Sequence, residues 1–473
     1  MIADLQPYPE YKDSKQLWLG CVPRHWPVLP NRALFAEVKE RGYPDEEMLS
    51  VTITQGIIRQ TALLTDSSKK DSSRQDRSAY KLVQPRDIAY NKMRAWQGAI
   101  GASELRGIVS PAYVVMRLRN KENLQRYFHY FYRTPHFAKE AERWSYGITS
   151  DMWSLRPEHF KMIYTPQPPP EEQAAIVRFL DWANGRLERA IGVKRKVIAL
   201  LNEQKQVIIH RAVTRGLDPD VRLTPSGIPW LGDIPVHWDV WRVSRFARVG
   251  NGSTPSRAKP AYWNGGTYPW LNSSQVNRGF IDSADQFVTP AALRECHLPQ
   301  IRAGSVLVAI TGQGKTRGMA AVLCFETTIN QHIAFITPRT AAVSPEFLHL
   351  AFTGAYRTLR ALSEDSGSTK GALTCEDLKR FKVALPPQQE QAALVDHIHS
   401  RTQTLDAIVT HTEREIELLR EYRTRLVADV VTGKLDVRAA AVHLPAEEKE
   451  RPAPIATEDL PDEAELELVG SGD

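Results

Sequence analysis

Basic, amide and aromatic side chains gather around glycine-rich turns in two parts of this 473-residue chain. Arginine and lysine can pair with the edge of guanine, asparagine and glutamine with that of adenine, and all four can bind phosphate. The two clusters therefore indicate contacts to a nucleic acid. In the first part the candidate contacts are Lys69, Lys70, Arg74, Asn91, Lys92, Arg94, Trp96 and Gln97.

The second cluster has the same mixture of residue types. The alternative interpretation is that the tryptophans are core residues and the polar residues form turns, and no single position excludes it. Two such clusters at corresponding places in two repeats favour binding. The candidate contacts here are Ser253, Thr254, Arg257, Asn272, Ser273, Ser274, Gln275, Lys315 and Arg317, with Lys370 further along the chain.

Motifs for catalysis or metal binding do not accompany these clusters. Residues 312–316 end like a phosphate-binding loop, but Ala309 stands where the motif G-x-x-x-x-G-K-[ST] requires its first glycine. A tight turn that presents Lys315 is the better interpretation. The four cysteines lack the spacing of a zinc site and are expected to be buried free thiols. His25 and His237 each precede a tryptophan and are expected to pack or cap, so no catalytic residue and no metal are predicted.

Charge is distributed unevenly along the chain. Residues 446–473 hold ten Asp or Glu and two Lys or Arg, a net charge of −8 against +6 for the whole chain, which leaves +14 for the remainder. A basic body is the electrostatic footprint of a nucleic-acid binder, although many other proteins share it. The acidic tail, with several prolines and few large apolar residues, is expected to be disordered.

Two sequence motifs occur twice, which indicates an internal duplication. The pattern W-L-G-x-x-P-x-H-W covers 18–26 and 230–238, and a helix opening of the form P-P-x-x-E-Q starts at Pro168 and Pro386. The two copies are 212 positions apart for the first motif and 218 for the second. The segment that separates the two motifs within a repeat is therefore longer in the second repeat. Each repeat is thus an opening segment, a globular block and a long helix.

The two long helical segments carry a narrow apolar stripe with charged flanks, which is typical of a coiled-coil seam. Both have the same stripe in the same register, so antiparallel pairing within one chain is the simplest arrangement, with a pseudo-two-fold axis relating the halves. Val197 and Ile408 belong to the same pattern. The predicted seam residues are Ile176, Leu180, Leu187, Leu201, Ile208, Leu394, Ile398, Leu405, Leu419 and Leu426.

Short apolar runs bounded by Gly, Pro, Asn and Asp predict strands in both globular blocks, followed by helical patterns at 121–131 and 345–362. The expected fold class is α+β, with two tandem mixed α/β domains separated by two long helices that form an intramolecular antiparallel coiled coil. The predicted boundaries are an N-terminal segment 1–26, a first block 27–167, a first helix 168–218, a repeated segment 219–238, a second block 239–385, a second helix 386–437 and the acidic tail 438–473.

Taken together, these motifs resemble the specificity subunits of Type I restriction-modification systems. The resemblance covers about residues 15–437, and its motifs come in the right order. It implies that the two blocks are target recognition domains, each of which contacts one half of a bipartite double-stranded DNA target, while the helices hold them apart. The motifs that carry it are the duplicated phrases together with 91–101, 110–113, 252–256, 262–266 and 269–271.

The family further implies a non-catalytic subunit that works in a complex. Its partners would be DNA adenine methyltransferase subunits, two per chain and docked on the helices, and a translocating restriction subunit. S-adenosylmethionine, ATP and Mg²⁺ would be bound by those partners, so this chain is expected to bind no cofactor. Because base-reading residues differ between members with different targets, no base contact is carried over from the family.

Two other classes of function stay open. The chain could be a coiled-coil scaffold for protein interactions, or a stand-alone specificity-like decoy without restriction partners. A self-sufficient methyltransferase or nuclease is disfavoured by the missing motifs. No run of about eighteen apolar residues predicts a membrane span, and the first thirty residues lack the pattern of a signal peptide. We therefore expect a cytoplasmic protein that lies on the nucleoid when bound to DNA.

Overall fold

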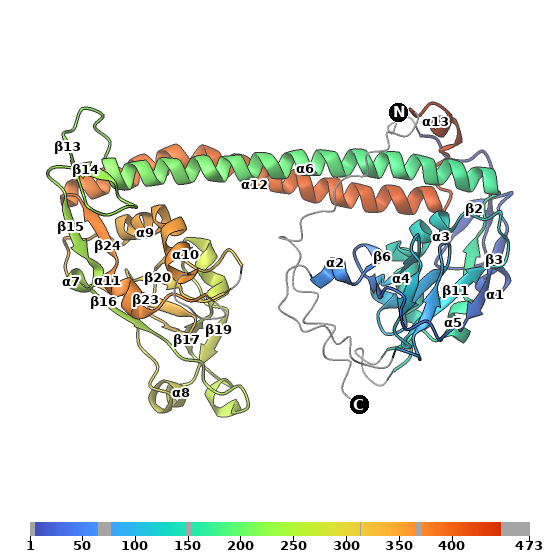
Figure 1. The fold of residues 1–473 in the computed structure, drawn as a ribbon, viewed down its shortest axis with the longest axis horizontal. Helices are drawn as coiled ribbons and strands as arrows, with labels where there is room; N and C mark the ends of the chain where they lie inside the picture. The colour runs from blue at the N-terminus through green and yellow to red at the C-terminus, as the bar shows by residue number, and fades with distance from the viewer. Residues whose placement is uncertain (1–4, 65–76, 148–152, 313, 365–370, 446–473) are drawn as a thin grey trace. The chain divides into compact units, whose positions relative to one another are not determined.

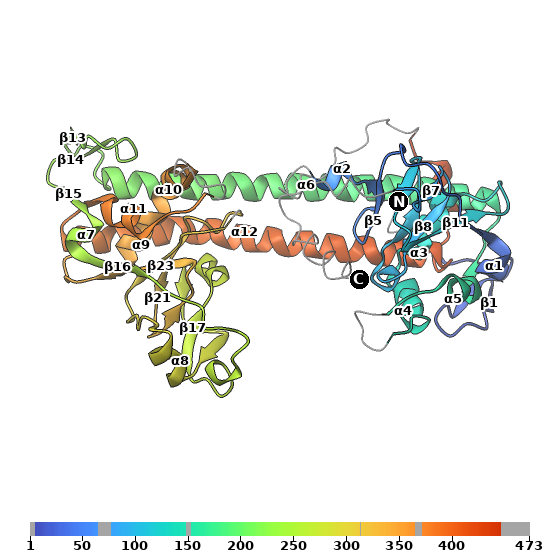
Figure 2. The same cartoon turned by 60° about the horizontal axis from the view of Figure 1, so that its bottom comes forward.

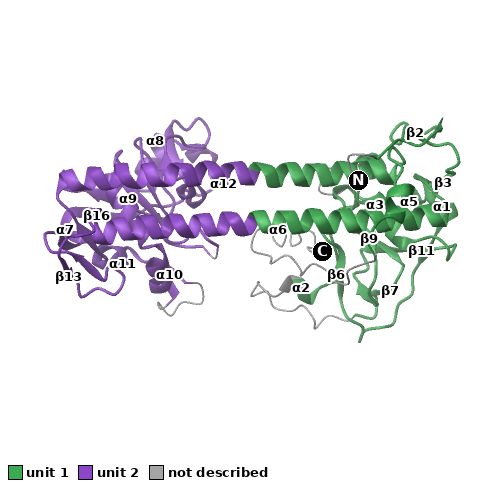
Figure 3. Cartoon of the chain, turned by 90° about the horizontal axis from the view of Figure 1, so that it is seen from above, with its two compact units in different colours: residues 1–194, 414–473 green, residues 195–413 purple. Residues whose placement is uncertain are grey.

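The computed structural model describes residues 5–64, 77–147, 153–312, 314–364 and 371–445. The chain divides into two compact units: unit 1 contains Met1–Lys194 and Arg414–Asp473, and unit 2 contains Arg195–Glu413. Each of the two long helices is shared between the units (Figure 3). The chain is a mixed α/β protein, as predicted, and both units follow the same plan.

Unit 1 is organised around an antiparallel sheet with the strand order β4-β11-β8-β9. Successive side chains of a strand point to opposite faces. Tyr90 and Met116 therefore lie in a large core with α3, whereas Ala89 and Val115 lie in a smaller core with β5, β7 and β10. The elements are β1 Tyr11–Asp13, β2 Cys21–Pro23, β3 Val28–Pro30, α1 Asn31–Leu34, β4 Phe35–Val38, β5 Leu49–Thr52, β6 Gly56–Arg59, α2 Thr61–Leu64, β7 Lys81–Val83, β8 Ile88–Asn91, η1 Ala95–Gln97, β9 Ile100–Ala102, β10 Gly107–Val109, β11 Tyr113–Leu118, α3 Gln125–Tyr132, α4 Pro135–Arg143, α5 Pro157–Met162, β12 Tyr164–Pro166 and α13 Arg438–Val442.

Unit 2 contains a sheet with the order β16-β23-β20-β21-β18. Val308 and Ile336 face a core with α9, and Leu307 and Phe335 face a second core on the other side. The elements are β13 Leu223–Pro225, β14 Asp233–Pro235, β15 Asp239–Arg242, α7 Val243–Phe246, β16 Ala247–Asn251, η3 Pro260–Tyr262, β17 Tyr268–Leu271, η4 Ser273–Arg278, β18 Phe280–Ile281, β19 Gln286–Val288, α8 Pro290–Glu295, β20 Val306–Ala309, β21 Ala320–Leu323, β22 Thr328–Ile329, β23 Ile333–Pro338, α9 Pro345–Gly354, α10 Tyr356–Glu364, α11 Cys375–Arg380 and β24 Lys382–Leu385. The helices shared by both units are α6 Pro170–Arg215 and α12 Gln388–Val431.

The two sheets share an order but differ in what is inserted into them. Strands β4, β11, β8 and β9 of unit 1 correspond to β16, β23, β20 and β21 of unit 2. Between the first and third of these strands, unit 1 inserts 39–87 and unit 2 inserts 252–305. The unit 2 insertion includes a distal lobe, defined here as 253–271 and 286–298, whose own core contains Trp270 and Val288. Within unit 2 this lobe lies away from α6 and α12 (Figures 1 and 2).

A carboxylate near the start of each long helix is held by the duplicated H-W pair. In unit 1, Glu172 of α6 accepts a hydrogen bond of 2.8 Å from Trp26 Nε1 and lies 2.6 Å from His25 Nε2. In unit 2, Glu390 of α12 is bound in the same way, at 3.0 Å by Trp238 Nε1 and at 2.8 Å by the histidine before it. A carboxylate in the first turn is also favoured by the helix dipole. Both predicted packing histidines thus have a structural partner, and we call each arrangement a helix clamp.

The glutamine that follows each clamp glutamate ties the long helix to its globular unit. Gln173 Oε1 accepts a hydrogen bond of 2.8 Å from the backbone of Leu124, and Gln391 Oε1 accepts one of 2.9 Å from that of Ser344. These two partners precede the equivalent helices α3 and α9. The repeated E-Q therefore has a physical explanation: the glutamate holds the opening segment, and the glutamine holds the loop before the next helix of the unit.

Helices α6 and α12 run antiparallel within each unit (Figure 1). In unit 1, Glu188 forms an ion pair with Arg423 and Lys194 forms one with Glu415. In unit 2, Lys205 pairs with Asp406. The partner's number falls on α12 as the residue number rises on α6, and the Lys194 pair measures 2.8 Å.

The predicted seam residues are all buried or half-buried, but several do more than pair the helices. Ile176 and Leu180 join the large core of unit 1, and Ile398 joins a core of unit 2. The pattern fails at Val197 and Ile408, which are 39% and 42% exposed. A straight helix has 3.6 residues per turn, so a stripe spaced by 3.5 residues drifts off the contact face. Buried seam residues are Ile176, Leu180, Leu187, Leu394, Ile398 and Leu426, and half-buried ones are Leu201, Ile208, Leu405 and Leu419.

Gly433, just after α12, is expected to tolerate no side chain. It has φ +77, and a Cβ there would lie 2.3 Å from Pro23 Cδ and 2.9 Å from Trp26 Cζ3. Gly433→Ala should lower the free energy of unfolding by about 2–4 kcal/mol, which combines left-handed strain with overpacking. Gly20 has φ +64 with nothing within 4 Å, so Gly20→Ala measures the strain alone, about 1–2 kcal/mol. Equal losses in urea unfolding would contradict the steric argument.

Candidate nucleic-acid interface

Two loops occupy the same place in the sheets of the two units. Sheet loop 1 (92–99) connects β8 to β9, and sheet loop 2 (310–319) connects β20 to β21. The first carbonyl of each loop accepts a hydrogen bond from a leucine just before α5 or α11: Leu155 to Lys92 at 2.9 Å, and Leu373 to Ile310 at 2.8 Å. The candidate contacts at 91–97 therefore correspond in space to Lys315 and its neighbours, although the two loops share no sequence motif.

Two of the candidate contacts build sheet loop 1. Asn91 Oδ1 accepts a hydrogen bond of 3.0 Å from the backbone of Met93, and Trp96 Nε1 donates one of 2.9 Å to the carbonyl of the same residue. The ring of Trp96 also packs edge-on against Trp153 at 5.6 Å. These side chains act as turn formers, which was the alternative interpretation. The loop leaves Lys92 and Arg94 half-buried and Gln97 exposed.

Arg133 fixes sheet loop 1 to the β5–β6 hairpin. Its guanidinium donates to the carbonyls of Ile53 and Thr54 in the hairpin, both at 2.7 Å, and to those of Gly98 and Ile100 at 3.2 and 3.0 Å. Burial lowers the pKa of Arg133 to about 10, so the group keeps its charge at neutral pH. The hairpin turn and sheet loop 1 consequently form one continuous surface of unit 1.

His129, on α3 beneath this surface, should make the protein sensitive to acid. Its Nδ1 accepts a hydrogen bond of 3.2 Å from the backbone of Ala102, and burial lowers its pKa to about 3. Below the unfolded-state value of about 6.5, the unfolded chain binds a proton that the folded chain does not, so stability falls as pH drops from about 6.5 towards 3. Because of this residue, the free energy of unfolding should be about 2 kcal/mol lower at pH 5 than at pH 7.

Urea unfolding at pH 7 and pH 5 measures that cost, and His129→Gln should remove it. His349 of unit 2, whose pKa burial lowers to about 4, provides a matched second site. If His129→Gln leaves the difference between the two pH values unchanged, the buried neutral histidine is not its cause.

Sheet loop 2 is held by α10. Tyr356 donates to the carbonyl of Lys315 at 2.7 Å, and the Lys315 side chain is exposed. Arg317 was predicted as a nucleic-acid contact, and the structure places its side chain in the interior of unit 2. It is 6% exposed, and its guanidinium donates to the carbonyl of Gly371 at 2.6 Å and to Glu364 at 3.3 Å. The guanidinium thus connects sheet loop 2 to Glu364 at the end of α10 and to Gly371 before α11.

Gln275 was also predicted as a contact, and its side chain is buried as well. It is 3% exposed and donates to Asp285 at 2.8 Å, because the inner side of the short helix η4 faces the protein. Asn272 caps the same helix by accepting a hydrogen bond of 3.0 Å from the backbone of Ser274. Of the other unit 2 candidates, Arg257 and Ser274 are exposed, and Ser253, Thr254, Asn272 and Ser273 are half-buried. Lys69, Lys70, Arg74 and Lys370 lie outside the described residues and stay predictions.

A chain of polar side chains in unit 2 was missed from the sequence. Thr254 donates to Gln331 at 2.5 Å, Gln331 lies 3.1 Å from His332, and His332 Nδ1 lies 2.7 Å from Thr311 Oγ1. The chain joins the end of β16, the β22–β23 connection and the start of sheet loop 2. A polar run at 330–332 between two apolar strands was the signal that could have found it.

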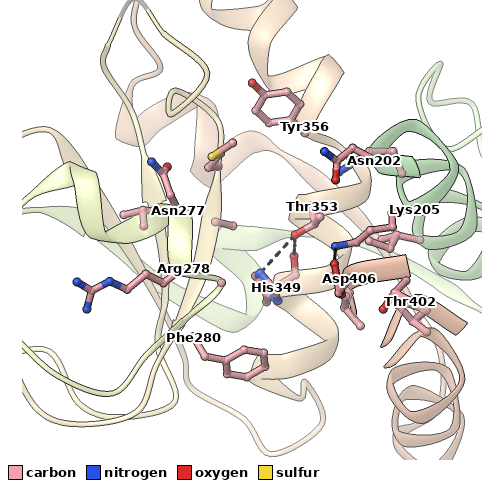
Figure 4. A pocket seen from close by; sticks show the side chains of 18 of the residues that line it. Asn202, Lys205, Asn277, Arg278, Phe280, His349, Thr353, Tyr356, Thr402 and Asp406 are labelled. Carbon is pink, nitrogen blue, oxygen red and sulfur yellow. Dashed lines mark hydrogen bonds and ion pairs between the residues drawn. The ribbon is translucent and has the colours of Figure 1, made fainter. Parts of the chain in front are cut away.

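A cleft of about 750 Å³ adjoins sheet loop 2 within unit 2 (Figure 4). One wall is formed by α6 and α12, where Lys205 pairs with Asp406. The other wall presents Arg278 and Phe280, and the phenyl ring is 46% exposed. The cleft therefore adds cationic and aromatic side chains beside Lys315.

Neither a metal site nor a membrane span is found in the part of the chain that the structure describes. No group of three or more His, Cys, Asp or Glu residues there could hold a metal ion. No helix there has both the length and the apolar character needed to cross a membrane.

Comparison with known proteins agrees with the duplicated motifs. The family model described as "Type I restriction modification DNA specificity domain" matches residues 235–418. The putative type I restriction enzyme MjaX specificity subunit of Methanocaldococcus jannaschii is 21% identical over 455 residues, which is 93% of this chain and 100% of that protein. The chain is thus similar to type I specificity subunits, and residues 235–418 match their DNA specificity domain. The matched domain covers most of unit 2, and unit 1 repeats its central sheet and its helix clamp.

Two further proteins are similar to this chain. The Type I restriction enzyme EcoR124I/EcoR124II specificity subunit of Escherichia coli is 24% identical over 168 residues, which is 35% of this chain and 41% of that subunit. The alignment thus spans less than half of that relative. A solved chain from a study of complex assembly in a type I R-M system has a TM-score of 0.61 at 16% identity, and the alignment covers 88% of this chain and 99% of that chain. That likeness concerns the fold.

Proposed function

We propose that this chain is the sequence-reading subunit of a type I restriction-modification complex and has no catalytic role of its own. In this proposal each unit contacts one half of a split double-stranded DNA target. The observation that carries it is the repeated sheet with an equivalent loop in each unit, 92–99 and 310–319, combined with insertions that differ. A common scaffold with different side chains fits two half-sites of different sequence.

The long helices are proposed to form an intramolecular antiparallel coiled coil that sets the distance between the two readers. The ion pairs of Lys194 and Lys205 with α12 fit antiparallel pairing in each unit. The two helix clamps fix where each helix begins relative to its unit. A fixed spacer of this kind would leave the base pairs between the half-sites unread.

The outer face of α6 is proposed to dock adenine methyltransferase subunits. Val193, Val197, Leu200 and Val207 are 64%, 39%, 56% and 61% exposed. Their 4-3-7 spacing places them on one helix face at coiled-coil positions, and an exposed apolar stripe marks an interaction surface. Two such subunits, one per repeat, together with a restriction subunit, would bring S-adenosylmethionine, ATP and Mg²⁺, so this chain would bind none of them.

Methylome sequencing tests the proposal in cells that carry the chain with its partner subunits. The expected result is methylated adenine in a split motif whose halves are about one helical turn apart, the spacing that governs paired readers on one face of DNA. A contiguous motif, or no motif with an active methyltransferase present, would overturn the proposal.

Exchange of one block provides the matched comparison. Replacing 239–385 by the corresponding block of another family member should change one half-site, and replacing 27–167 should change the other. If either exchange alters both halves, the units do not read separately.

A protein-interaction scaffold is the competing function, because the exposed stripe on α6 would serve it equally well. Binding of the assembled complex to DNA at different salt concentrations separates the two. Release of counterions makes the affinity of a DNA reader fall steeply as salt rises. A scaffold would show no sequence-specific DNA binding at any salt concentration.

A further inference from the structure

An exposed arginine in the distal lobe of unit 2 is held in one orientation by uncharged groups. The guanidinium of Arg257 lies 3.6 Å from the ring centroid of Trp263 and 5.2 Å from that of Trp270. One of its terminal nitrogens donates a hydrogen bond of 2.6 Å to Gln286 Oε1. Stacking on tryptophan and a hydrogen bond to an amide fix the side chain without neutralising its charge.

The two tryptophans form a platform anchored to the backbone that carries Arg257. Trp263 Nε1 donates to the carbonyl of Ser256, and Trp270 Nε1 donates to that of Ser253, both at 3.2 Å. The rings meet edge to face at 5.2 Å, and Trp270 is 3% exposed. Both indole N–H groups therefore tie down the segment just before the arginine, and the ring faces remain for its guanidinium.

A second set of contacts holds the lobe together around this platform. Lys259 Nζ donates to the Tyr262 hydroxyl at 2.8 Å and lies 2.9 Å from Glu295, and the same hydroxyl donates to Glu295 at 2.8 Å. These contacts join η3 to α8. The nearby lysine thus has a carboxylate partner, whereas Arg257 is bound by an amide and by aromatic rings.

An arginine side chain carries about 2 kcal/mol of rotamer entropy, which binding must otherwise remove. Stacking restrains it in advance, and the planar fork of N–H groups matches the O6 and N7 acceptors of guanine in the major groove. A phosphate contact needs only a positive charge and gains little from a fixed plane. Arg257 also lies in the insertion that differs between the units, where differences in target sequence would be encoded.

We propose that Arg257 reads a guanine in the half-site contacted by unit 2, and that Trp263 is the positioning residue that orients it. This inference rests on the proposed function. It assigns one base pair of the target to one side chain, and it predicts that the remainder of the split motif is independent of that side chain.

Methylation by the complete complex tests the assignment, with Arg257→Met and Arg257→Lys compared with the unchanged chain. Arg257→Met should lose roughly 10- to 100-fold in discrimination at one G·C pair of one half-site, the loss expected for a bidentate contact. The other half-site should keep its specificity. Lysine should lose less than methionine, because it can still donate to guanine but lacks the planar fork and the stacking on Trp263.

Modified DNA and a platform variant provide independent readouts. Replacing each guanine in turn by 7-deazaguanine, which lacks the N7 acceptor, should slow methylation by the unchanged complex at one position and have no effect there with Arg257→Met. Trp263→Leu should weaken discrimination at the same base pair, and Trp263→Phe should keep most of it. Equal thermal midpoints for the two Trp263 variants separate positioning from misfolding.

The outcomes are distinguishable. If Arg257→Met slows methylation of every sequence equally, the residue is a phosphate contact and the inference is wrong. An unchanged motif with Arg257→Met also overturns it. If the unchanged complex methylates no split motif, the proposed function fails, and this inference fails with it.

Discussion

Replacing Glu172 by alanine is expected to lower the free energy of unfolding by about 3–5 kcal/mol, the usual cost of removing one partner from a buried charged network. The carboxylate is 10% exposed. It accepts hydrogen bonds from Trp26 Nε1 at 2.8 Å and from the Tyr8 hydroxyl at 3.3 Å, and it pairs with Arg438 at 3.3 Å. The variant leaves a buried indole and a buried hydroxyl without their acceptor.

The second helix clamp provides the matched control. Glu390 is 28% exposed and is held by His237 and Trp238. Water can replace part of what Glu390→Ala removes, so its cost should be about 1–2 kcal/mol. Urea unfolding followed by tryptophan fluorescence measures both variants. Equal losses would show that the burial of Glu172 does not set its contribution.

Repetition made much of the fold predictable. The sequence motifs that occur twice identify the opening segments and the starts of the long helices. The helices indeed begin at Pro170 and Gln388. The partners of the repeated residues were not predictable. Nothing in the sequence alone brings Glu172 to Trp26, because 146 positions separate them and a tertiary contact joins them. The repeats thus identified residues with a structural role, and the structure identified the residues that they contact.

Residue type alone was a poor guide to the candidate interface. Gln275 and Arg317 have the chemistry of nucleic-acid contacts, yet both are buried, because exposure depends on which side of a short turn faces the sheet. Gln331 and His332 were missed for the opposite reason, since they stand in a short connection between apolar strands. Arg257 was predicted from its type, but its orientation on Trp263 became visible only in the structure.

A proline in the middle of α6 is expected to separate the two proposed readers without unfolding them. Gly192 suits this test because a Cβ there would meet nothing within 4 Å, so a substitution disturbs the helix backbone and no side-chain packing. Proline in a helix interior removes a hydrogen bond, clashes with the preceding turn and costs about 3 kcal/mol or more. Gly192→Ala is the matched control and should stabilise the helix by up to about 1 kcal/mol.

The readout is affinity for DNA with both half-sites compared with DNA that has one. Two linked readers gain roughly 10²- to 10⁴-fold when both engage at once, and that gain is lost if a kink in the helix prevents simultaneous engagement. Gly192→Pro should therefore bind the full split target at least about 100-fold more weakly and bind a single half-site as before, while Gly192→Ala matches the unchanged chain. The same loss is expected for the seam variants Leu187→Pro and Leu405→Pro. Full affinity and methylation of the split target by Gly192→Pro would show that α6 does not set the distance between the readers.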